Sequence, residues 1–114
     1  MKYEDKQIGF SSDLVPLIKE GSKTFTYRLG DKYDFIQIGD VIKTHDSSDN
    51  QVFAELEIIE KSYTTFGELP IDRVGHEAYP SKEVQRETFK KYYKRDIADD
   101  EKILVLGFKV LNFL

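Results

Sequence analysis

Apolar positions follow helical spacing in two parts of the chain and strand-like alternation in four others. The first helical pattern predicts a short helix over residues 13–20, with Ser11 and Asp13 among the residues that offer capping oxygens. Gly21 follows the last apolar position of this segment. We expect it to end the helix in the left-handed conformation, because glycine adopts that conformation without steric cost.

Alternating β-branched and aromatic residues predict strands over 23–28, 41–45 and 51–61, and a terminal strand over 103–114. The polar loop 46–50 is expected to join the second and third strands as a hairpin. Gly107 interrupts the terminal strand. It indicates a bulge or a sharp bend at that point, since glycine gives a strand no side chain to pack.

Two more helices are predicted between the third strand and the last. Thr65 and Glu68 match a capping box, which predicts a short helix that Pro70 limits. Ser81 is expected to cap an amphipathic helix over 82–95. The order of elements predicts one α+β domain over residues 1–114. Its strongly bent, mostly antiparallel sheet should close toward a small barrel, with short helices beside it.

Composition restricts the classes of function. The chain has 114 residues, 17 Lys plus Arg, 21 Asp plus Glu, a net charge of −4 and no cysteine. A net-acidic chain is a poor non-specific binder of nucleic acid, so such a role requires a local patch. With no thiolate and only two histidines, we expect neither a metal nor a cofactor. We find no secretory signal and no apolar run of about 18 residues, and we therefore expect a cytoplasmic protein without a membrane partner.

Polar groups gather where the first helix meets the first strand. Lys23 stands at the bend, and strand parity places Thr24, Thr26 and Arg28 on one face and Tyr27 on the other. These groups are candidates for a binding site. In the alternative interpretation the threonines only fill strand positions, while the lysine and the arginine are solvated.

The helix over 82–95 is locally basic. Lys90 and Lys94 fall in its last turns and are candidate phosphate contacts, with Tyr92 and Tyr93 as candidate stacking rings. The alternative is that the basic residues complement the helix dipole and pair with acids at helical spacing, as in Glu87–Lys90.

Glu77 and His76 lie in the turn between the two later helices. An exposed loop glutamate is usually just solvated, so Glu77 alone carries no functional signal. We expect His76 to face water rather than to tune a site.

Taken in order, these features resemble the ASCH domain, a branch of the PUA-like superfamily. The pattern Gly-x-Lys-Thr-x-Thr-x-Arg over 21–28 resembles the start of that domain. Four more features follow in the family's order: the Gly-Asp pair at 39–40, the short helix at 65–69, the His-Glu-Ala turn at 76–78 and the closing strand at 105–110. The resemblance covers residues 10–113.

The resemblance implies a small pseudo-barrel with a cleft, and an association with RNA binding and RNA-base metabolism. Some small bacterial members that the chain resembles are amidohydrolases that remove the acetyl group from acetylated cytidine. Their catalytic lysine, threonine and glutamate correspond to Lys23, Thr26 and Glu77. In that chemistry a base-activated threonine hydroxyl is the nucleophile, and a desolvated lysine is a suitable base.

The expected function is recognition of RNA, or of a nucleobase or nucleoside, in this cleft. Besides the three residues above, the candidate binding residues are Arg28, Thr24, Tyr27, Tyr79, Lys90 and Lys94. Two alternatives stay open: an amidohydrolase acting on acetylated cytidine, and a protein-interaction domain without a nucleic-acid ligand.

Overall fold

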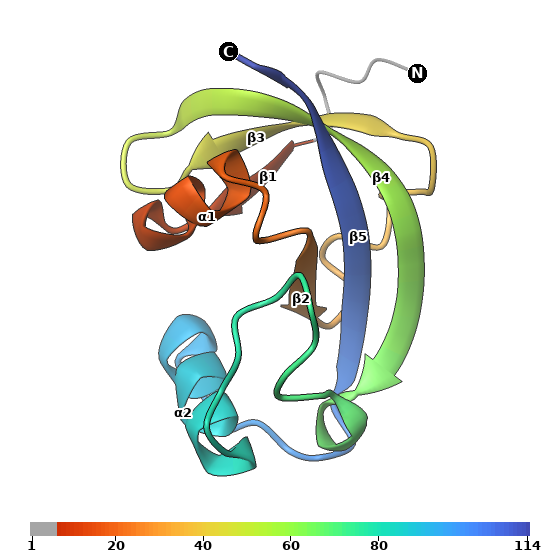
Figure 1. Cartoon of the computed structure of the whole chain (residues 1–114). Coiled ribbons are helices and arrows are strands. Elements are labelled where there is room, and N and C mark those ends of the chain that lie inside the picture. Colours follow the sequence, from red (N-terminus) through yellow and green to blue (C-terminus); the bar gives the residue numbers. More distant parts are fainter. Residues whose placement is uncertain (1–6) are drawn as a thin grey trace.

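A computed structural model describes residues 7–114 of the protein. Its strands are β1 (Gln7–Phe10), β2 (Phe25–Leu29), β3 (Val41–Asp46), β4 (Gln51–Thr65) and β5 (Lys102–Phe113). They form one curled sheet in the order β1-β3-β4-β5-β2 (Figure 1). β1 runs parallel to β3, and every other neighbouring pair is antiparallel. The α+β fold with a strongly bent, mostly antiparallel sheet is therefore confirmed.

Two short helices lie on the concave side of the sheet (Figure 1). A 3-10 turn over Ser12–Leu14 leads into α1 (Val15–Lys19), and α2 (Lys82–Tyr93) follows a second 3-10 turn over Phe66–Glu68. Gly21 has φ +86°, as expected of a left-handed cap after α1. The Ser81 hydroxyl accepts a hydrogen bond from the Val84 N–H at 3.2 Å, so the predicted cap of α2 is confirmed.

Several local details differ from the sequence prediction. β1 was not expected. The capping box at Thr65 does not form, because its side chain makes no cap hydrogen bond and the turn is a 3-10 helix. α2 ends at Tyr93 instead of residue 95, because Lys94 adopts the left-handed conformation, with φ +58°.

The long pair β4–β5 forms the spine of the sheet and bends at the predicted glycine. Ile58 pairs with Phe108 and Glu60 with Gly107, so Ile59 is the extra residue of a bulge. A Cβ atom at Gly107 would lie 2.9 Å from both the Glu60 Cβ and the Phe25 ring. Glycine is therefore required where these strands and the Phe25 ring come close together.

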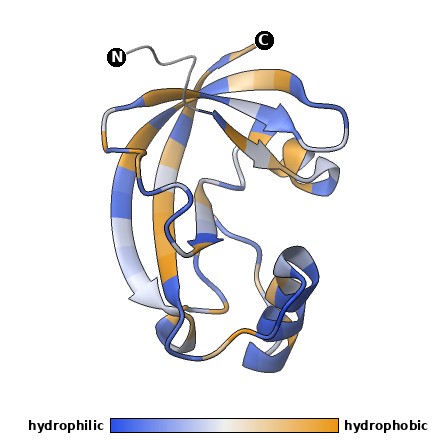
Figure 2. Ribbon diagram, turned by 180° about the vertical axis from the view of Figure 1, so that it is seen from behind, coloured by the Kyte–Doolittle hydropathy of each residue, from blue (hydrophilic) through white to orange (hydrophobic). Residues whose placement is uncertain are grey.

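The core consists of two clusters of buried side chains. The first cluster packs α1 against β1, β3, β4 and β5, and includes Ile8, Phe10, Ile18, Ile42, Leu56, Ile58, Leu104, Leu106 and Phe108. The second packs α2 against β2 and β5, and consists of Tyr27, Phe66, Leu69, Phe89, Ile97, Ile103 and Val105. Consecutive residues of β5 thus alternate between the clusters, as strand geometry requires. β5 is hydrophobic along its central part, whereas α2 is mainly hydrophilic (Figure 2).

Candidate functional site

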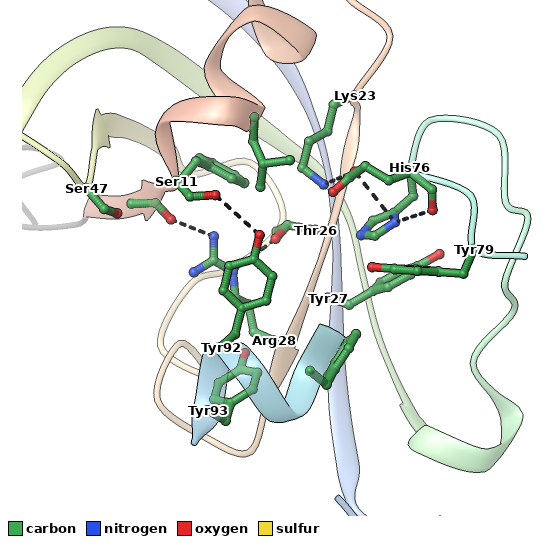
Figure 3. A pocket seen from close by; sticks show the side chains of 15 residues that line it. Ser11, Lys23, Thr26, Tyr27, Arg28, Ser47, His76, Tyr79, Tyr92 and Tyr93 are labelled. Atoms are coloured by element: carbon green, nitrogen blue, oxygen red, sulfur yellow. Dashed lines mark hydrogen bonds and ion pairs between the residues drawn. The ribbon is translucent and has the colours of Figure 1, made fainter. Parts of the chain in front are cut away.

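A cleft of about 290 Å³ opens between β2, the loop after β1, the segment before α2 and the last turns of α2. Figure 3 shows the side chains that line it. They include six of the residues singled out from the sequence: Lys23, Thr26, Tyr27, Arg28, Glu77 and Tyr79. The structure therefore brings the ammonium of Lys23 and the hydroxyl of Thr26, which are close in sequence, together with the carboxylate of Glu77, which lies 54 residues beyond Lys23 along the chain.

Lys23 and Glu77 form a close ion pair in the cleft. The distance from Lys23 Nζ to Glu77 Oε2 is 2.6 Å, and the lysine side chain is 3% exposed, whereas the glutamate is 27% exposed. Burial lowers the pKa of the Lys23 ammonium, although the nearby Glu77 carboxylate opposes that shift. The pair therefore holds a largely desolvated lysine beside a carboxylate that a ligand can still reach.

The His76 side chain is only 6% exposed, so the expectation that it faces water is wrong. Its ring stacks on Tyr27, with 3.9 Å between the centroids and 11° between the planes. Nδ1 lies 3.1 Å from the carbonyl oxygen of Glu77. Burial, assisted by the nearby Lys23 charge, lowers the pKa of His76 to about 4. The imidazole is therefore neutral at physiological pH.

Arg28 reaches into the cleft from the same face of β2 as Thr26. Its Nε donates to Thr26 Oγ1 at 2.9 Å, and one terminal nitrogen donates to the carbonyl oxygen of Gly9 at 2.7 Å. The guanidinium carbon lies 4.9 Å from the Phe10 ring centroid and 5.1 Å from that of Tyr33. Burial lowers the pKa of Arg28, but an arginine remains charged in proteins. These contacts place Thr26 and Arg28 on one face, as predicted, and fix the guanidinium next to the threonine hydroxyl.

Tyrosines of α2 close the opposite wall of the cleft. The Tyr92 hydroxyl lies 3.4 Å from the Ser11 hydroxyl, across the opening (Figure 3). The Tyr93 hydroxyl accepts a hydrogen bond of 3.0 Å from the Leu29 N–H, at the free edge of β2. Tyr79 lies near His76, with 6.1 Å between the two ring centroids. Burial raises the pKa of the Tyr79 hydroxyl. Aromatic faces therefore surround the polar groups.

Solved structures with the same arrangement of elements indicate the fold. The protein EF3133 from Enterococcus faecalis, of the family DUF984, matches with a TM-score of 0.76 and 19% identity over 100% of this chain and 84% of that one. An ASCH domain from Lactobacillus crispatus matches with a TM-score of 0.65 and 16% identity, over 94% and 80%. The ASCH protein of Zymomonas mobilis gives 0.61 and 15%, over 95% and 71%. This chain has an ASCH-like fold.

At these identities the likeness concerns the ASCH-like fold alone. No protein-family model matches the sequence, and no curated protein matches it. Within residues 7–114, no helix has both the length and the apolar character that a membrane crossing demands. The same residues contain no group of three or more His, Asp or Glu side chains arranged to hold a metal ion.

Three of the candidate binding residues lie outside the cleft. Thr24 does not line it, and its backbone N–H instead donates to the carbonyl oxygen of Gly75 at 2.7 Å. Lys90 and Lys94 lie along a separate surface groove, where Lys90 pairs with Asp96 at 3.2 Å. The basic residues of α2 therefore pair partly with the turn that follows the helix, rather than with acids inside it.

The charges inside the cleft do not balance. The charged residues that line it are Lys23, Arg28 and Glu77, because His76 is neutral. The local charge is therefore +1, in a chain whose net charge is −4. A cleft with this charge and these aromatic walls suits a flat, polar, electron-rich ligand.

Proposed function

We propose that the cleft lined by Lys23, Arg28 and Glu77 binds a nucleobase or a nucleoside. The observation that carries the proposal is the convergence of Lys23, Thr26, Arg28 and Glu77, from two segments far apart in sequence, on one partly enclosed cavity. A volume of about 290 Å³ lies at the small end of the roughly 300–1,000 Å³ typical of small-molecule sites. It suits one nucleoside better than a stretch of polymer.

The polar groups of the cleft match the edge of a base. The Lys23 ammonium is a donor, and Glu77 Oε1 is an acceptor that makes no hydrogen bond within residues 7–114. An exocyclic amine next to a ring acceptor, as in cytosine, complements this pair. Tyr79 and Tyr92 offer faces on which a ring can stack. By contrast, Lys90 and Lys94 lie outside the cleft, and this favours a small ligand over a long RNA.

Titration calorimetry tests this proposal. We expect cytidine to bind and Glu77→Gln to weaken it at least tenfold, because a hydrogen bond to a charged group is worth roughly 1.5–3 kcal/mol. The matched control is Glu60→Gln, which removes a carboxylate that pairs with Arg73 at 3.0 Å, outside the cleft. Absence of binding by cytidine, uridine, adenosine and short RNA would overturn the proposal and favour a protein-interaction domain.

A second function, hydrolysis of the amide of acetylated cytidine, is favoured by the surroundings of Thr26. Its hydroxyl accepts the Arg28 Nε–H, so the hydroxyl proton remains free to pass to a base. Lys23, with its lowered pKa, lines the same cleft. In this chemistry the Thr26 oxygen bonds to the acetyl carbon and its proton passes to the base. The C–N bond then breaks, the amine leaves with a proton, and water releases acetate from the threonine.

Chromatography of acetylated cytidine incubated with the protein tests this second function. We expect cytidine and acetate to appear in equal amounts, and Thr26→Val to abolish their release while cytidine still binds. Thr26→Val keeps the shape of the side chain but removes the acceptor of the Arg28 Nε–H, so circular dichroism must first show that the variant folds. Thr26→Ser should retain part of the activity. Binding of acetylated cytidine without any release would limit the function to recognition.

A further inference from the structure

The Arg28 guanidinium has no counter-charge among the residues that the structure describes. Within residues 7–114, no carboxylate lies within 4.0 Å of it, whereas Lys23 has Glu77 at 2.6 Å. Its neighbours are the Phe10 and Tyr33 rings, a threonine hydroxyl and a backbone carbonyl. Partly buried charges in proteins are normally paired, because removing them from water is costly. An unpaired arginine that lines a cavity therefore indicates that the ligand supplies the anion.

Several N–H donors of the Arg28 guanidinium make no hydrogen bond in the part of the chain that the structure describes. An arginine carries five N–H donors. One of them binds Thr26 Oγ1 and another binds the Gly9 carbonyl oxygen, so three make no hydrogen bond within residues 7–114. The hydroxyls of Ser11, Ser47 and Tyr92 line the same cavity. Figure 3 shows Ser47 and Arg28 on one side of the cleft, and Lys23 and His76 on the other.

We infer that the cleft has two subsites and that its preferred ligand is a nucleoside monophosphate. The inference rests on the proposed function, because it places the base at Lys23 and Glu77. The phosphate then binds the free guanidinium donors of Arg28, with Ser11 and Ser47 as neutral donors. Guanidinium and phosphate match well, because the planar fork makes two parallel hydrogen bonds to two oxygens.

Affinity measurements with four probes test the inference: cytidine, cytidine 5′-monophosphate, ribose 5-phosphate and inorganic phosphate. We expect the monophosphate to bind at least tenfold more tightly than cytidine, and we expect added salt to weaken only the phosphorylated ligands. Arg28→Gln should abolish this preference. Arg73→Gln is the matched control, since that guanidinium lies over the Phe25 ring at 3.8 Å, outside the cleft.

The outcomes separate the two proposals. If cytidine and its monophosphate bind equally, the phosphate subsite is wrong and nucleoside recognition stands. Equal binding is also the result expected if Arg28 only stabilises an oxyanion and binds no phosphate. If ribose 5-phosphate binds through Arg28 but no base-containing ligand binds more tightly, the subsite stands and the proposed function is wrong. Should Arg28→Gln fail to fold, Ser47→Ala gives the same comparison. It should reduce affinity for the monophosphate and leave that for cytidine unchanged.

Discussion

We expect mutations of Lys23 and of Glu77, the two partners of the ion pair, to change the free energy of unfolding very differently. Glu77→Gln leaves a lysine that is 3% exposed without its carboxylate. Removing one partner of a buried pair costs about 3–5 kcal/mol. Because Glu77 is 27% exposed, water partly compensates, and we expect a loss of about 2 kcal/mol in the free energy of unfolding. Lys23→Met removes the buried charge itself and should leave stability unchanged or raise it.

The pH dependence of Glu77→Gln gives a second, independent readout. Glu77 raises the pKa of Lys23, so its removal moves that pKa further below the ordinary value of 10.5. A lysine with a lowered pKa in the folded state destabilises the protein at pH values below that pKa. The penalty disappears as the pH rises toward 10.5. The stability lost in Glu77→Gln should therefore be largest at neutral pH and smaller at about pH 9.5.

Urea unfolding followed by far-ultraviolet circular dichroism measures these effects. The double variant Lys23→Met with Glu77→Gln should regain most of the stability that Glu77→Gln loses. The control is Glu60→Gln, whose partner Arg73 is 34% exposed, and we expect it to cost less than about 1 kcal/mol. Equal losses in Glu77→Gln and Glu60→Gln, or a double variant no more stable than the single one, would refute the reasoning.

Three further predictions concern His76, Ser81 and Gly75. The pKa of His76 is about 4 in the folded protein, against an ordinary value of 6.5. The free energy of unfolding should therefore be at its full value above pH 6.5 and fall as the pH drops toward 4. His76→Gln should reduce this loss when unfolding is measured as a function of acid pH. Ser81→Ala removes the acceptor for the Val84 N–H and should cost about 1 kcal/mol in urea unfolding, whereas Ser22→Ala, at an exposed position outside a helix, should cost less. Gly75→Ala should lower the melting temperature strongly, because the φ of residue 75 is +92°. In addition, the new Cβ would overlap Thr24 Oγ1 and lie 2.9 Å from the Phe25 ring. A melting temperature like that of the unchanged protein would contradict this.

Local signals made much of the fold predictable. The Ser81 cap, the left-handed Gly21 and the bulge opposite Gly107 each depend on the chemistry of one or two residues. β1 could not be found in this way. It is four residues long, and it pairs in parallel with residues 43–46, so no turn next to it in sequence marks the pairing.

The candidate site depended more on long-range contacts. Lys23 and Glu77 are 54 residues apart, and no spacing rule links them, so only the family resemblance suggested that they meet. The burial of His76 could not be predicted, because it results from stacking on Tyr27 of a different element. The ion pair of Lys90 could not be predicted for a related reason: its partner Asp96 lies beyond the end of α2, where helical periodicity no longer applies.

The alternation of side chains along β5 ties the two halves of the molecule together. Ile103 and Val105 belong to the cluster under α2, whereas Leu104 and Leu106 belong to the cluster under α1. Because both clusters pack on the same strand, we expect them to unfold together. Phe10 of one cluster and Tyr27 and Phe89 of the other line the cleft, so we expect the shared strand to hold the walls of the cleft at a fixed spacing before any ligand binds.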